Sequence, residues 1–126
     1  MARLEADLAL TDAAFADLPQ ALEQIAAEIN AEFCWLDLRN VSLALLAGAR
    51  KLRVEILVEI NPAGTCCILL RSAEGMGNGA PLTTAVLQQL VEQLLQFLPA
   101  ATLSYRSDQD GPIRKQKQNH RSDQQC

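Results

Sequence analysis

Side chains that commonly perform catalysis are scarce in this sequence. It has one histidine, His120, in a polar C-terminal segment, and its four cysteines show no Cys-x-x-Cys spacing. A catalytic triad and a tetrahedral zinc site therefore both lack the residues they need. Aromatic residues make up 4% of the chain, so the core must be built from Leu, Ile, Val and Ala. We expect a protein that is not an enzyme and that uses no metal or cofactor.

Long apolar segments are also missing. No run reaches the roughly 18 apolar residues of a membrane-spanning helix, and Glu5 and Asp7 interrupt the N-terminal segment where a signal peptide needs a continuous apolar stretch. Cys66 and Cys67 are neighbours in a predicted strand and so point to opposite faces, which is typical of small core residues in a reducing compartment. We expect a cytoplasmic protein without a membrane partner.

The charge is distributed unevenly along the chain. The net charge is −4, but residues 106–126 carry five basic and three acidic side chains, a balance of +2, which leaves −6 on the preceding residues. An acidic body argues against nucleic-acid binding. The length suffices for one core. We predict one domain over residues 1–106 and a polar tail without fixed structure over 107–126, which could contact an acidic partner.

Hydrophobic periodicity predicts the first elements. Apolar and polar residues alternate over 4–10, which is the pattern of a half-buried strand. Apolar residues at helical spacing predict a helix over 18–30, with Asp17 as its cap and Pro19 in its first turn. Trp35, the only tryptophan, is expected to fill the core under the helices, with an exposed binding anchor as the alternative.

The segment 38–49 permits two interpretations. As a helix it places Leu38, Val41 and Leu45 on one face and has Gly48 as a C-terminal stop. As a strand it has a poor polar face, because leucine and alanine occupy both sets of alternate positions. The high leucine and alanine content favours the helix, which we predict here. The strand remains the alternative.

The remaining elements have clear patterns. Strict alternation predicts a strand over 52–60, followed by the turn Asn61-Pro62-Ala63-Gly64 and a second strand over 65–71. A wide apolar stripe predicts a helix over 82–98, and 101–105 indicates one more strand. This order predicts an α+β fold, a two-layer sandwich with helices packed on one face of a mostly antiparallel sheet.

A glycine-rich loop over 73–81 separates the second strand of the hairpin from the long helix. Gly75, Gly77 and Gly79 are the candidate cofactor-binding residues, because such a loop brings backbone N–H groups close to a phosphate. The Lys-Ser/Thr pair of a Walker loop is absent, and a dinucleotide fingerprint belongs early in a long parallel sheet. The alternative is a tight connection in which the three glycines supply positive φ and Pro81 starts the helix.

The order of elements resembles the ATP-binding domain shared by histidine kinases and anti-sigma-factor serine kinases. Residues 38–49 look like the first nucleotide-binding helix of that family, and the hairpin 52–71 looks like its central strands. Residues 73–77 resemble its Asp-x-Gly-x-Gly loop, and 103–107 resemble the strand after its last helix. The resemblance spans roughly residues 4–111 and implies an ATP-binding site at the glycine loop.

This chain departs from the family at the positions that carry its chemistry. The resemblance places Ala73 where the family has the aspartate that holds adenine, and Ala44 and Gly48 where it has Mg²⁺ ligands. Without oxygen ligands, Mg²⁺ and the charge on a transferring phosphate are not stabilised. The glycine-rich lid is reduced to Asn78-Gly79. The resemblance therefore implies a degenerate, non-catalytic member whose loop glycines are vestigial.

Two functional hypotheses follow. The first is a regulatory protein-binding module on a degenerate kinase-like ATP-binding fold, with an unidentified protein as partner. The second is a small acidic dimeric chaperone of the kind that holds secreted effectors, and a homodimer is expected there. A helix over 38–49 favours the first hypothesis, and a strand there favours the second. Arg50-Lys51-Arg53 is a basic cluster that is read either as ordinary surface or as a contact for an anion or partner.

Overall fold

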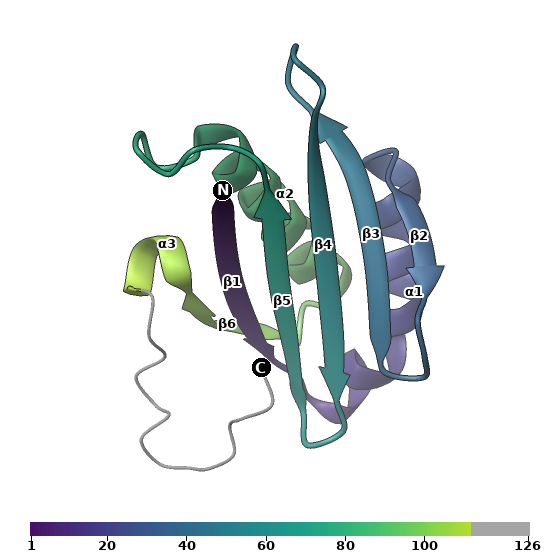
Figure 1. The fold of residues 1–126 in the computed structure, drawn as a ribbon. Coiled ribbons are helices and arrows are strands. Elements are labelled where there is room, and N and C mark those ends of the chain that lie inside the picture. Colours follow the sequence, from purple (N-terminus) through teal and green to yellow (C-terminus); the bar gives the residue numbers. More distant parts are fainter. Residues whose placement is uncertain (112–126) are drawn as a thin grey trace.

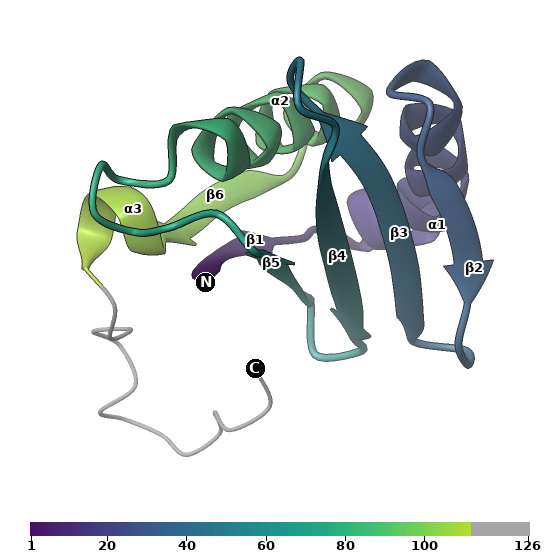
Figure 2. The same ribbon diagram turned by 45° about the horizontal axis from the view of Figure 1, so that its top comes forward.

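Six antiparallel strands form one sheet, and two long helices lie on one of its faces (Figures 1 and 2). The computed structural model describes residues 1–111. The sheet has the order β2-β3-β4-β5-β1-β6. The strands are β1 (Ala2–Ala9), β2 (Glu32–Trp35), β3 (Asn40–Ala47), β4 (Leu52–Asn61), β5 (Thr65–Ser72) and β6 (Thr102–Arg106). The helices are α1 (Asp12–Glu28), α2 (Pro81–Phe97) and the single turn α3 (Ser107–Asp110). The predicted α+β sandwich is confirmed.

The core lies between the sheet and the two long helices. Alternate side chains of the four central strands point into it, which is why the period-two pattern predicts their inner faces. The helices contribute leucine and isoleucine side chains that are at most 1% exposed, among them Leu18, Leu22 and Ile25 of α1 and Leu87, Leu90 and Leu94 of α2. Each such burial stabilises the fold by about 2 kcal/mol. The opposite face of the sheet carries no helix; we call it the open face.

The helix predicted over 38–49 is wrong. Residues 40–47 form β3, which pairs along its length with β4 and on its other side with β2. Val41 and Leu43 are at most 1% exposed on the core face, while Ala44 is 6% exposed on the open face. Helix propensity is a weak preference, and here pairing on both sides outweighs it. The segment therefore does not form the nucleotide-binding helix that the resemblance implies.

Helix α1 begins six residues earlier than predicted. Thr11 is its N-cap, and its Oγ1 accepts a hydrogen bond from the Ala14 N–H over 3.2 Å. Pro19 therefore lies inside the helix, where it cannot donate a helical hydrogen bond. Leu18 before the proline and Leu22 after it are fully buried in the core, so burial on both sides of this point offsets the cost of the proline.

The two ends of the sheet also differ from prediction. Trp35 is not a core residue, because it lies on the edge strand β2 and is 37% exposed. Residues 107–110, predicted without fixed structure, form α3, in which the Ser107 Oγ accepts a hydrogen bond from the Glu5 N–H. Arg106 is 4% exposed and is held by Asp108. Residues 112–126 of the predicted tail lie outside the described residues.

The two adjacent cysteines of β5 occupy opposite faces of the sheet, as predicted. Cys66 is fully buried in the core, and this burial raises the pKa of its thiol to about 12. Cys67 lies on the open face and is 8% exposed. None of the described helices is long and apolar enough to cross a membrane.

Candidate functional site: the cleft at the glycine loop

A cleft of about 830 Å³ lies between the turn that joins β3 to β4 and the glycine loop. Both segments leave the same end of the sheet (Figure 1). The turn contributes basic side chains and the loop contributes mainly backbone. The lining residues used below are Arg50, Lys51, Arg53, Ala73, Glu74, Gly75, Gly77 and Leu82. The structure thus brings together the basic cluster and the glycine loop, which the sequence presents as separate features.

Gly48 determines how closely the turn approaches α2. Its φ is +75°, a conformation that side chains other than glycine rarely adopt. A Cβ at this position would lie 3.1 Å from the nearest methyl carbon of Leu82. Gly48 is therefore a turn residue packed over the start of α2 rather than the end of a helix. This close approach places the turn beside Leu82, which lines the cleft.

A carboxylate of the chain itself occupies the N-terminus of α2. Glu74 Oε2 accepts a hydrogen bond from the Leu82 N–H over 2.9 Å, and Oε1 accepts one from the Thr83 N–H over 2.7 Å. The N-terminus of a helix attracts anions because its first N–H groups lack partners within the helix. Here Glu74 fills the position that a bound phosphate would take. The residue at the N-cap, Ala80, has no side chain that could do so.

Two buried hydroxyl groups connect Glu74 back to its own backbone. The Thr83 Oγ1 donates to Glu74 Oε1 over 2.7 Å, and the Glu74 N–H donates to the Ser72 Oγ over 3.1 Å. The Ser72 and Thr83 oxygens lie 2.7 Å apart. Because the Thr83 proton is already used, Ser72 is the donor between them. The result is a closed ring of hydrogen bonds that joins the end of β5 to the first turn of α2.

The surroundings of Glu74 favour its ionised form. Partial burial is the largest single influence on its pKa and raises it. The hydrogen bonds from Thr83 and Leu82, together with the positive charge of Arg50, outweigh that effect and lower the pKa below its ordinary value. Glu74 is therefore a permanent negative charge at neutral pH, with Arg50 across the cleft.

The loop glycines have unequal roles. Gly79 has a φ of +81° and precedes Ala80, which has a φ of +48°. Gly75 and Gly77 are not in the positive-φ region, so the alternative in which all three glycines supply positive φ is wrong for these two. Pro81 opens α2 as predicted. No contact within the fold requires a glycine at 75 or 77, because a Cβ at either position would meet nothing within 4 Å.

The basic wall of the cleft is open to solvent. Arg53 forms ion pairs with Glu55 over 3.2 Å and with Glu32 over 4.0 Å, and its side chain is 55% exposed. Exposed pairs of this kind contribute at most about 1 kcal/mol. Arg50 and Lys51 can attract an acidic surface electrostatically. Among the described residues, no group of three or more His, Cys, Asp or Glu side chains could hold a metal ion.

The positions that the resemblance singles out do not form one site. Ala73 lines the cleft and Gly48 packs against Leu82 in the β3–β4 turn, but Ala44 is on the open face in the middle of β3. The residues that organise the loop, Glu74 and Thr83, were missed from the sequence. A signal was present: a helix whose N-cap is Ala80 needs a cap from elsewhere, and the loop contains one acid.

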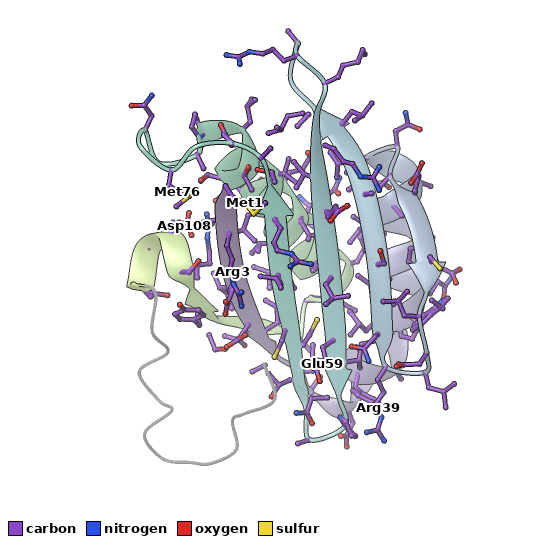
Figure 3. The ribbon with its side chains drawn as sticks, viewed as in Figure 1. Met1, Arg3, Arg39, Glu59, Met76 and Asp108 are labelled. Atoms are coloured by element: carbon purple, nitrogen blue, oxygen red, sulfur yellow. The ribbon has the colours of Figure 1, made fainter. Side chains whose placement is uncertain are left out.

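The open face presents a second surface (Figure 3). Leu57 of β4 and Leu69 of β5 stand opposite each other at its centre, and Leu57 is 36% exposed. They line a hollow of about 170 Å³ together with Glu55 and Arg71. Arg3 and Glu59 project from the same face on β1 and β4 (Figure 3). The face therefore combines a small apolar centre with charges of both signs.

Comparisons with models of protein families and with curated proteins find no match to this chain.

Proposed function

We propose that this protein is a non-catalytic regulatory module that acts by binding another protein through the open face of its sheet. The supporting observation is that α1 and α2 cover one face, while Leu57 and Leu69 occupy the centre of the other without a covering element among residues 1–111. A small apolar centre within a polar rim is the arrangement found in protein-binding surfaces.

The cleft supports a role without nucleotide. A phosphate at the start of α2 would have to displace the Glu74 carboxylate and break its hydrogen bonds to Leu82 and Thr83. The negative charge of Glu74 would also repel it. The loop glycines then serve as a connection, and the kinase-like chemistry that the resemblance implies has no part in the proposal.

A second candidate is the small acidic dimeric chaperone of secreted proteins. The observation that favours it is β3, because a strand over 40–47 extends the meander β2-β3-β4-β5 where the kinase-like alternative requires a helix. The acidic body is consistent with both candidates. They differ in the partner, which is a folded regulator in the first case and an unfolded segment of a secreted protein in the second.

A capture experiment with matched variants tests the proposal. Tagged full-length chain is used as bait in an extract of its source organism, beside Leu57→Asp on the open face and Leu38→Asp in the β2–β3 loop, where Leu38 is 93% exposed. We expect a protein that the wild type and Leu38→Asp retain and that Leu57→Asp loses. Circular dichroism confirms that both variants fold. Equal retention by Leu57→Asp and the wild type would contradict binding through the open face.

A further inference from the structure

The outer edge of β2 is suited to pairing with a second copy of the chain. β2 is the terminal strand of the sheet, and Figure 1 shows no described element beyond it. Natural edge strands are commonly protected by short length, charged side chains, proline or a bulge. β2 reads Glu-Phe-Cys-Trp, and its four residues pair with β3 without a break in register. The edge is short and carries the charge of Glu32, but it is regular and has neither a proline nor a bulge to block pairing.

The hydrogen bonds show which backbone groups face outward. The Leu36 N–H donates to the Asn40 C=O over 2.8 Å, and the Ile60 N–H donates to the Arg39 C=O over 2.7 Å. In an antiparallel pair, successive residues alternate between bonding to one neighbour and to the other. Counting back from Leu36, Cys34 bonds to β3. The backbone N–H and C=O groups of Phe33 and Trp35 therefore point away from the sheet.

The side chains of this edge are apolar on the helix-covered side. Phe33 and Trp35 stand opposite buried residues of β3 and contact each other edge to face, with ring centroids 5.9 Å apart at 80°. Trp35 remains 37% exposed. Cys34 lies on the open face and is an exposed free thiol. A partner strand would bury the rest of the tryptophan.

The geometry points to a homodimer in which two β2 strands pair antiparallel about a two-fold axis at Cys34. In this register Phe33 of each copy lies opposite Trp35 of the other, and each such pair exchanges both outward hydrogen bonds. The aromatic contact within one chain then extends across the axis. Cys34 faces its own counterpart in a non-hydrogen-bonded pair, and Glu32 faces Leu36, so no like charges meet.

The alternatives fit less well. A register centred on Phe33 pairs Phe33 with Phe33 but places Trp35 opposite Ala31, so it keeps one aromatic pair between strands instead of two. The other edge strand, β6, exposes Thr102 and Ser104, which are polar. Such a dimer does not compete with binding of another protein through the open face, because its two-fold axis runs perpendicular to the sheet. Two six-stranded sheets then join into one, with both open faces on the same side and still accessible.

Oxidative cross-linking of the unaltered protein tests the register. Opposed residues in a non-hydrogen-bonded pair have Cα atoms about 4.5 Å apart, which is within the range of a disulfide. Diamide accepts the two thiol hydrogens as each disulfide forms. We expect a covalent dimer whose peptide map contains Cys34 joined to Cys34 and whose yield falls on dilution in step with dissociation. A map without this linkage would overturn the register.

Sedimentation of two lysine variants tests the interface. Cys34→Lys places two lysine side chains opposite each other at the axis, where the Cβ atoms of opposed residues lie about 5 Å apart, while Thr102→Lys makes the same charge change at another exposed position, on β6. We expect the wild type and Thr102→Lys to sediment as dimers, and the dissociation constant of Cys34→Lys to rise about tenfold or more. A monomeric wild type, or dissociation by Thr102→Lys but not by Cys34→Lys, would overturn the proposal. Far-UV circular dichroism confirms that each variant is folded.

Discussion

Replacing Thr83 by valine tests whether the hydrogen-bond ring holds the glycine loop on α2. The substitution keeps the shape of the side chain and removes only its hydroxyl, which is fully buried. That hydroxyl takes part in two hydrogen bonds of 2.7 Å, and without it the buried Ser72 hydroxyl loses its acceptor. A buried hydrogen bond contributes about 1 kcal/mol, and a buried donor without a partner costs about 1 kcal/mol more. We expect the free energy of unfolding to fall by about 2–3 kcal/mol.

The assay is urea unfolding followed by far-UV circular dichroism, with Thr84→Val as the matched control. Thr84 is the next residue, and its exposed hydroxyl donates only to the Gly79 C=O over 3.0 Å. An exposed bond of this kind contributes little, so the control should change stability by less than about 0.5 kcal/mol. Equal losses in the two variants would refute the reasoning, because the ring would then add nothing beyond an ordinary surface hydrogen bond.

Three further predictions concern Glu74, the loop glycines and the cysteines. Because the pKa of Glu74 is lowered in the fold, its contribution to stability is complete above its ordinary value of 4.5 and is lost as the pH falls through the folded value. The stability gap between wild type and Glu74→Gln should therefore narrow in acid, and urea unfolding across a pH series would disprove this if the gap stayed constant. Gly79→Ala should lower the free energy of unfolding by about 1 kcal/mol because the φ of Gly79 is +81°, whereas Gly77→Ala should change it by less than about 0.5 kcal/mol. Equal shifts of the thermal unfolding midpoint in the two variants would contradict the different backbone roles of these glycines. Iodoacetamide should modify Cys34 in the native protein but Cys66 only in urea, because Cys66 is buried and its pKa is raised to about 12. Peptide mapping that finds Cys66 modified in the native protein would contradict its buried position in the core.

The sequence pattern predicts the elements that have one polar face and one apolar face. In β4 the charged residues Arg53, Glu55 and Glu59 alternate with buried aliphatic ones, so the strand and its side-chain orientation can both be read from the sequence. The pattern fails for β3. Leucine and alanine fill both of its faces, the open face included, so period two disappears and helix propensity misleads.

The candidate site could be located but not explained from the sequence. The glycine loop was predicted between a strand and a helix, and it lies there. The role of Glu74 depends on contacts with Leu82 and Thr83, eight and nine residues away, which no periodic pattern encodes. The approach of Arg50 to Glu74 requires the β3–β4 turn, which the predicted helix over 38–49 would have removed.

A thermal-shift titration with Mg-ATP tests most directly the claim that the glycine loop is closed by Glu74 and that the protein acts without nucleotide. A ligand that binds the folded state raises the unfolding temperature with its concentration. We predict that the unfolding midpoint of the full chain stays unchanged up to millimolar Mg-ATP. A rise that depends on the dose would contradict the account, because ATP would then occupy the helix N-terminus that we assign to the Glu74 carboxylate.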